Sequence, residues 1–254
     1  MWRLEAQSFI SAKDGANIAE CEDAIAVNEI MRRYAIADGA TEAFDAGSWA
    51  RALVESWTTE ESCFDTDESF KLWARATGER WEGEWSGREL AWYAEAKRER
   101  GSFAAFAGVV FDEDERGLKW RAVALGDACV IHRRANVIVC AMPLDDARKF
   151  NATPQLVPSR TERHADVWQH LCIEAGEVRD GDVLLLLTDA VAAWYLRLFA
   201  EADSSITKFE NALADGRDEE LNLLIDAERC AGRLRDDDVA AVRIEAKGLR
   251  ESQF

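Results

Sequence analysis

The sequence predicts a domain of the α+β class, with helices packed outside the β-sheets. Strand-like apolar runs open and close the chain, and helical segments come in groups instead of alternating with single strands. The chain has 254 residues, 48% of them apolar, and no Pro-rich linker divides it, which favours a single domain over residues 1–254. The order of the segments therefore argues against a fold built from βαβ units.

The N-terminal part of the chain reads as three strands and a helix. The runs at 3–12, 21–28 and 32–38 crowd apolar residues together, as buried strands do. From Thr41 the apolar spacing becomes helical and continues to Trp57, and Thr41 with Glu42 is the predicted N-terminal cap. We expect this helix to pack behind the end of the third strand.

A tryptophan-rich helical segment follows at about residues 58–100. Trp81 and Trp85 are four residues apart, so they share a helical face. Rings of this size usually serve core packing, and we expect them to seat a helical layer on the sheet. A partner-binding surface is the alternative interpretation.

The second half of the chain begins with four consecutive strand-like runs at 102–112, 117–127, 128–136 and 137–144. The stretch 145–167 contains two of the three prolines and reads as a loop or flap. A buried strand then precedes Thr188, a helix follows Asp189, and two more helical stretches lie within 204–231. The acidic run Asp236-Asp237-Asp238 leads into the closing strand.

Composition excludes several classes of protein. The net charge of −18 would repel nucleic acid and anionic membranes, and no basic patch offsets it. No run is long enough to span a membrane and the N-terminus lacks a signal-like apolar core, so we expect a cytoplasmic protein. Six scattered cysteines indicate reduced thiols, and three histidines without cysteines at ligand spacing give no support for zinc.

Acidic residues recur where strands end or begin. Asp38 ends one strand, Asp127 lies between two, Asp189 ends the most apolar one, and further acids open the second and last strands. One such acid is an ordinary cap or turn residue. Several together need a countercharge, because two carboxylates about 4 Å apart repel by about 4 kcal/mol at an effective dielectric of about 20. Oxygen-only ligands suit Mg²⁺ or Mn²⁺.

The segments that carry these acids resemble the motifs of one enzyme family. "ECEDAIAV", "YAIADGAT", "ALGDACVI", "LLLLTDAVAAW" and "RDDDVAAVRI", in this order, are similar to the acid motifs of the metal-dependent Ser/Thr protein phosphatases of type 2C, the PPM family, in its bacterial form. The resemblance covers about residues 8–246. It implies a four-layer αββα sandwich of two antiparallel sheets flanked by helices, with two Mn²⁺ or Mg²⁺ ions at one edge.

The resemblance also implies roles for single residues. Asp38 matches the acid that bridges both ions, and Gly39 offers its carbonyl to one of them. Glu22 matches a ligand of the second ion, and Asp189 and Asp237 match ligands of the first. Asp38, Asp189 and Asp237 are thus the implied catalytic residues.

Two further acids have implied roles outside this ligand set. Asp23 matches a residue that holds metal-bound water, and Asp127 matches an acid linked to the second ion's waters or to a third, weaker ion. The arginine that grips the substrate phosphate in many members is Ile18 here. Lys13 is a candidate replacement, although an exposed lysine without a role is the alternative, and it would lack the bidentate grip of arginine.

The implied function is hydrolysis of phosphoserine and phosphothreonine by a hydroxide that bridges the metal ions. Its partners would be phosphorylated proteins, such as a Ser/Thr kinase or the targets of that kinase. The missing phosphate arginine and the tryptophan-rich segment keep a second reading open, a phosphatase-like regulatory or phosphoprotein-binding module with little turnover.

Overall fold

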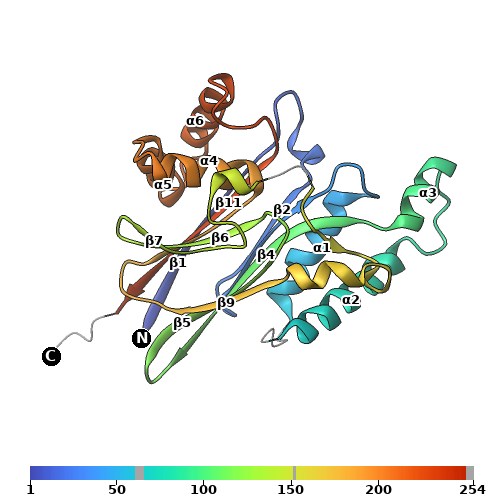
Figure 1. Cartoon of the computed structure of the whole chain (residues 1–254), viewed down its shortest axis with the longest axis horizontal. Coiled ribbons are helices and arrows are strands. Elements are labelled where there is room, and N and C mark those ends of the chain that lie inside the picture. The colour runs from blue at the N-terminus through green and yellow to red at the C-terminus, as the bar shows by residue number, and fades with distance from the viewer. Residues whose placement is uncertain (61–65, 151–152, 250–254) are drawn as a thin grey trace.

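Two antiparallel β-sheets lie face to face, and helices cover the outer face of each (Figure 1). The structure is a computed structural model and describes residues 1–60, 66–150 and 153–249. One sheet has the strand order β1 (Trp2–Ser11), β11 (Val239–Gly248), β10 (Val183–Leu187), β6 (Cys129–Arg134) and β7 (Val137–Met142). The other has the order β2 (Asp23–Asn28), β3 (Arg33–Gly39), β4 (Phe103–Asp114), β5 (Gly117–Leu125) and β9 (Cys172–Glu177), and β8 (Val157–Pro158) pairs with β4.

Alternation of side chains along the strands builds three apolar layers. In β3, Tyr34 and Ile36 face the space between the sheets, whereas the residues next to them face the helices. In β10, Leu184 and Leu186 face the same central layer, and their neighbours pack under the helices on the other side. Both strands are apolar on both faces because both faces are covered. The predicted α+β sandwich of four layers is confirmed.

The helices form two groups. α1 (Ala46–Thr59), α2 (Asp67–Glu84) and α3 (Trp92–Arg100) belong to the side of β2–β5, and α4 (Asp189–Ala200), α5 (Ser205–Ala214) and α6 (Asp218–Cys230) cover the sheet that contains β10 (Figure 1). Short 3₁₀ helices occupy Ile18–Glu20, Ala147–Lys149, Thr161–Arg163 and Ala165–His170. Within the described ranges, none of the helices has both the length and the hydropathy to cross a bilayer.

The tryptophans of the segment at 58–100 mainly serve the core, as expected. Trp73 and Trp81 are buried in the layer that joins α1 and α2 to the sheet, and the rings of Trp81 and Trp85 lie 6.3 Å apart. A side chain at Gly108 of β4 would come within 2.5 Å of the Trp57 ring, so the glycine makes room for that ring. Trp92 differs from the others, because it is 82% exposed.

The boundaries differ from the sequence expectation in three places. α1 begins at Ala46, so the predicted cap at Thr41 and Glu42 was wrong, and residues 40–45 form turns before the helix. β9 was not expected, and the segment 145–167 contains short 3₁₀ helices and β8. The described cysteines are all free thiols, and Cys63 lies outside the described residues.

Candidate metal centre

Two acids of the six-stranded sheet lie directly opposite each other on neighbouring strands, at the end of the sheet where β2 begins and β3 ends. Asp23 begins β2 and Asp38 lies near the end of β3, and the antiparallel register pairs them. Across the sandwich, the hydroxyl of Thr188 donates a hydrogen bond to Oδ2 of Asp23 at 2.9 Å. The end of β10 is thereby joined to the start of β2, and the acids of both sheets meet at one edge.

The register of the five-stranded sheet brings its acids to the same edge. Leu187 at the end of β10 pairs with Cys129 at the start of β6 and with Ala241 near the start of β11. Asp127 and Asp189 lie two residues beyond this level, in the segments that precede β6 and follow β10. Antiparallel pairing therefore converts acids far apart in sequence into neighbours.

Three of these acids form a close group. One carboxylate oxygen from each of Asp38, Asp127 and Asp189 lies within 4.8 Å of the other two. Asp127 is 4% exposed and Asp189 is 8% exposed, so water screens their repulsion poorly. A set of carboxylate oxygens at this spacing fits a hard divalent cation such as Mg²⁺ or Mn²⁺.

The electrostatics of the group indicate a shortage of positive charge. Burial, followed by the charges of Asp23, Asp189 and Asp127, raises the pKa of Asp38 well above its ordinary value. Burial and the nearby Asp189 raise the pKa of Asp127 to about 7. Burial also raises the pKa of Asp23, and its hydrogen bond from Thr188 only partly opposes this. These carboxyls must either keep protons near neutral pH or share a bound cation.

Arg235 is a member of this site that the sequence reading missed. Its guanidinium donates a hydrogen bond to Asp189 and lies 3.1 Å from Oδ2 of Asp237. Asp237 is therefore paired with Arg235 and is not part of the group of three acids. Asp127 is part of that group, although the resemblance implied that it lies outside the ligand set of the two main ions. The only sequence signal for Arg235 was its position before the acidic run.

Asp238, a second residue without an expected role, ties the N-terminal segment to the site. Its Oδ1 accepts a hydrogen bond from the backbone N–H of Lys13 at 2.9 Å, and its Oδ2 accepts one from the N–H of Glu22 at 2.8 Å. Asp238 is 5% exposed, so these bonds satisfy both oxygens of a buried carboxylate. Lys13 thus reaches the site through its main chain.

Glu22 and Gly39 lie at the same edge. The carbonyl of Glu22 accepts a hydrogen bond from the N–H of Gly39 at 3.2 Å, and Oε2 of Glu22 accepts one from the hydroxyl of Thr41 at 2.6 Å. A Cβ at Gly39 would lie 2.7 Å from the carbonyl carbon of Ala46. The glycine therefore lets the first residue of α1 approach the end of β3, a cause that the sequence did not indicate.

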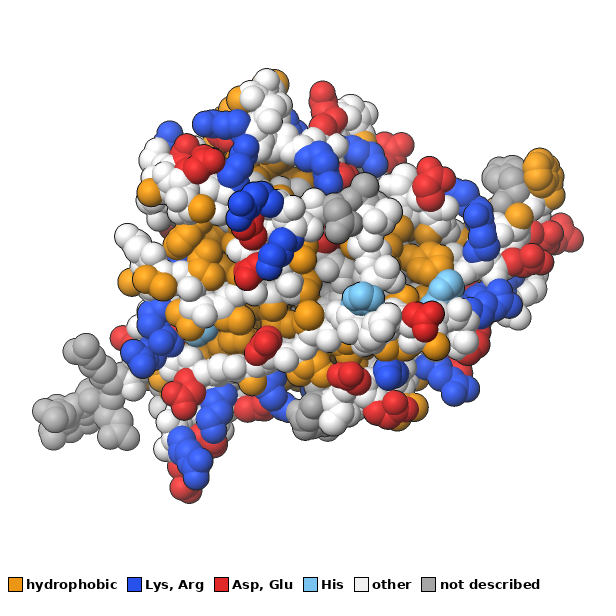
Figure 2. Space-filling model, viewed as in Figure 1, with side chains coloured by type: hydrophobic (Ala, Val, Ile, Leu, Met, Phe, Trp, Pro, Cys, Tyr) orange, Lys and Arg blue, Asp and Glu red, His pale blue; other side chains and the backbone are white. Residues whose placement is uncertain are grey.

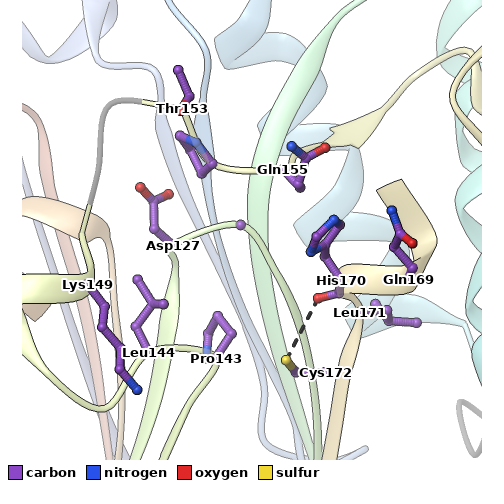
Figure 3. A pocket seen from close by; sticks show the side chains of 12 residues that line it. Asp127, Pro143, Leu144, Lys149, Thr153, Gln155, Gln169, His170, Leu171 and Cys172 are labelled. Atoms are coloured by element: carbon purple, nitrogen blue, oxygen red, sulfur yellow. Dashed lines mark hydrogen bonds between the residues drawn. The ribbon is translucent and has the colours of Figure 1, made fainter. Parts of the chain in front are cut away.

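A cavity of about 450 Å³ opens beside the acid group. Asp127 lines it on one side, and Gln155, Gln169 and His170 line it from the chain between β7 and β9 (Figure 3). Polar groups that can donate hydrogen bonds thus share this cavity with Asp127, which suits a site for a hydrated anionic substrate.

No family model matches the sequence, and no match is found among curated proteins. Solved structures do match. The catalytic domain of the serine/threonine protein phosphatase PstP, in complex with two manganese ions, has a TM-score of 0.64 at 15% identity, over 98% of this chain and 100% of that one. The PPM Ser-Thr phosphatase MsPP from Mycobacterium smegmatis, in complex with cacodylate, has a TM-score of 0.53 at 16% identity, over 96% and 98% of the two chains.

A third match has a different printed role. The phosphatase domain of the cell fate determinant SpoIIE from Bacillus subtilis has a TM-score of 0.51 at 14% identity, over 100% of this chain and 96% of that one. At these identities the likeness shows the fold alone. The chain has the fold of the bacterial type 2C phosphatases, and the resemblance found in the sequence is confirmed at this level.

Proposed function

We propose that this chain is a metal-dependent phosphoprotein phosphatase that hydrolyses phosphoserine and phosphothreonine. The observation that carries the proposal is the group of carboxylates from Asp38, Asp127 and Asp189 at the sheet edge of a type 2C phosphatase fold. The proposed partners are phosphorylated proteins, among them a Ser/Thr kinase or its targets, and the proposed location is the cytoplasm.

The proposed cofactor is a pair of divalent cations. Asp38, Asp127 and Asp189 supply oxygen ligands, and Glu22, Asp237 and the Gly39 carbonyl are proposed to complete the set around two Mn²⁺ or Mg²⁺ ions, with a third, weaker ion near Asp127. When bound, such ions lower the pKa of water and offset negative charge on a phosphoryl group.

The chain's own residues prepare this chemistry by fixing the acids. Thr188 orients Asp23, Thr41 orients Glu22, and Asp238 holds the backbone that carries Glu22. Side chains fixed in this way need no reorganisation when charge develops in the reaction. Burial at the edge of the sheets also strengthens every charge interaction made there.

The proposal is tested by hydrolysis of p-nitrophenyl phosphate and of a phosphothreonine peptide, with Mn²⁺ or with EDTA. We expect release of product only with metal, and a loss of at least about a hundredfold in Asp38→Asn and Asp189→Asn because each removes charge that the ions need. Arg116→Gln, in the exposed turn between β4 and β5, is the matched control. Activity that persists in EDTA would overturn the proposal.

A regulatory module with little turnover is the second candidate. It is favoured by Ile18, which stands where many type 2C phosphatases carry a phosphate-binding arginine and is 59% exposed. In that case calorimetry would detect Mn²⁺ binding that Asp38→Asn abolishes, and a phosphopeptide would bind without being hydrolysed. Lys13 remains the sequence-based candidate for the phosphate contact, and Lys13→Ala would then weaken binding of the phosphopeptide.

A further inference from the structure

A second cavity, of about 300 Å³, is lined by Asp189 and shares no lining residue with the first. It is a groove between one face of α4, the 3₁₀ helix at Ala147–Lys149 and the segment that precedes β11. Three arginines line it, Arg197 from α4 and Arg233 and Arg235 from that segment. Figure 2 shows Lys and Arg side chains gathering on this face over α4–α6, although the whole chain has a net charge of −18.

The three arginines differ in how far their charge is neutralised. Arg235 is paired with Asp189 and Asp237. Arg233 is paired with Glu228, and Asp203 lies 3.8 Å from it. Arg197 donates a hydrogen bond to the carbonyl of Arg233, and no carboxylate of the described residues lies within 4.0 Å of it. A guanidinium without a carboxylate partner has donors that an anion in the groove can accept from.

The position of Arg197 relative to the acid group sets the spacing of such an anion. Asp189 and Arg197 are eight residues apart on α4, so their Cα atoms lie about 12 Å apart along the helix axis. An extended peptide covers about 3.3–3.6 Å per residue, so this distance equals three to four residues. A peptide whose phosphoresidue lies at the acid group would therefore bring a side chain three or four positions away to Arg197.

We propose that this groove selects phosphorylated substrates that carry an anionic side chain three or four residues from the phosphoresidue, with Arg197 binding that anion. The anion is a carboxylate or a second phosphate, since both present oxygens that match the guanidinium fork. The proposal rests on the proposed function, because it takes the acid group as the place of the phosphoresidue. Arg197 would act as a specificity residue and would not touch the reacting atoms.

The test uses a set of phosphothreonine peptides with glutamate at one of the positions −4, −3, +3 and +4, each with a glutamine counterpart, and one peptide with a second phosphoresidue in place of the preferred glutamate. For the wild-type chain with Mn²⁺ we expect glutamate in one direction to lower KM about fivefold with little change in kcat, as for one partly exposed charge pair. Arg197→Gln should remove this preference, and Arg116→Gln, which is separated from the level of Asp38 by about 30 Å along β4, should keep it.

Reversing the charge at position 197 distinguishes a change in specificity from a loss of activity through misfolding. Arg197→Glu should prefer lysine over glutamate at the same peptide position, which a damaged site could not produce. The doubly phosphorylated peptide distinguishes the two sources of the anion, according to whether it or the glutamate peptide has the lower KM. Equal KM values for all glutamate and glutamine peptides, or a preference that survives in Arg197→Glu, would overturn the proposal.

Failure of the proposed function gives a different result. Fluorescence anisotropy with labelled peptides that carry a non-hydrolysable phosphonate measures binding without any turnover. Selective binding of the acidic peptide that depends on Arg197, in a chain that hydrolyses nothing, would support the groove and contradict the phosphatase. Metal-dependent hydrolysis without any preference for the acidic peptide, in kinetics or in binding, would support the phosphatase and contradict the groove.

Discussion

The guanidinium of Arg235 donates a hydrogen bond to Asp189 and lies 3.1 Å from Oδ2 of Asp237. Arg235 therefore binds the same carboxylate, that of Asp189, that a bound cation would also use as a ligand. A guanidinium and a metal ion repel each other, so the two compete for the Asp189 carboxylate. Arg235 is half exposed, which leaves its side chain room to turn towards solvent or the groove.

We predict that Arg235→Gln binds Mn²⁺ about five- to tenfold more tightly than the wild type, because a competing positive charge is gone. Isothermal titration calorimetry on the metal-free chain measures this directly, with Arg116→Gln as the control. The same variant should unfold at a lower temperature in EDTA, because the carboxylates lose their neighbouring cation. Unchanged or weaker Mn²⁺ binding would show that Arg235 and the ion do not compete.

A second prediction concerns the pH dependence of stability in EDTA. The pKa of Asp127 is raised to about 7, and those of Asp23 and Asp38 are also raised, so the folded chain keeps protons that the unfolded chain has already lost. Stability from these groups is present below the unfolded pKa of about 4 and is lost as pH rises towards about 7. For Asp127 the loss is at most about 4 kcal/mol, from about three pKa units.

His132 acts in the opposite direction, because burial lowers its pKa and the folded chain then binds fewer protons than the unfolded one at acid pH. The three carboxyls of Asp23, Asp38 and Asp127 together outweigh the single imidazole. We therefore expect the melting temperature in EDTA to fall as the pH rises from 5 to about 8. Mn²⁺ should raise that temperature more at pH 8 than at pH 5, because ligands must be deprotonated. Asp127→Asn should make the melting temperature depend less on pH. A melting temperature in EDTA that rises over this range would contradict the raised pKa values of the three carboxyls.

The sequence predicted the parts of this site that depend on regular strands. The apolar runs located β3 and β10. Acids that follow such runs lie at the ends of the strands, so strand pairing places them at the ends of the two sheets. The strands were identifiable because burial on both faces leaves a continuous apolar run. Asp38 and Asp189 could therefore be named without coordinates.

Other features depend on tertiary contacts that leave little trace in the sequence. β9, Cys172–Glu177, is an edge strand with two glutamates and a glycine, and its apolar pattern is too weak to identify. The start of α1 at Ala46 depends on its packing against Gly39. The pairing of Arg235 with Asp189 depends on where the segment before β11 crosses the end of β10, which local pattern does not encode.

A third prediction concerns Asp238, which holds the N-terminal segment against the site. Asp238→Ala leaves the backbone N–H groups of Lys13 and Glu22 without their acceptor and should cost about 2–4 kcal/mol, since each unpaired buried donor costs about 1–3 kcal/mol. Asp238→Asn keeps one acceptor oxygen and should lie between Asp238→Ala and the wild type. Urea unfolding measures the series.

The neighbouring Asp236 is the control for that series. Its side chain is 58% exposed and accepts a hydrogen bond from the N–H of Asp14, so Asp236→Ala should cost less than about 1 kcal/mol. A loss for Asp238→Ala no larger than the loss for Asp236→Ala would mean that water replaces the Asp238 contacts without penalty.

The last prediction uses the contact between Gly39 and α1. In Gly39→Ala the new methyl group would lie 2.7 Å from the carbonyl carbon and oxygen of Ala46, and this neighbour is backbone that cannot rotate away. Overpacking of this kind costs about 1–3 kcal/mol, and it would also shift the end of β3 that carries Asp38. We therefore expect lower stability in urea together with weaker Mn²⁺ binding by calorimetry.

Gly83→Ala is the matched substitution for Gly39→Ala. Gly83 lies in the last turn of α2 and is exposed, and a Cβ at this position would have no atom within 4 Å, so alanine there should stabilise the chain by about 0.5–1 kcal/mol through helix propensity. Opposite signs for the two substitutions would separate steric contact with α1 from any general effect of replacing glycine. A Gly39→Ala chain with wild-type stability and wild-type Mn²⁺ affinity would mean that α1 can move away from β3 without disturbing the acid group.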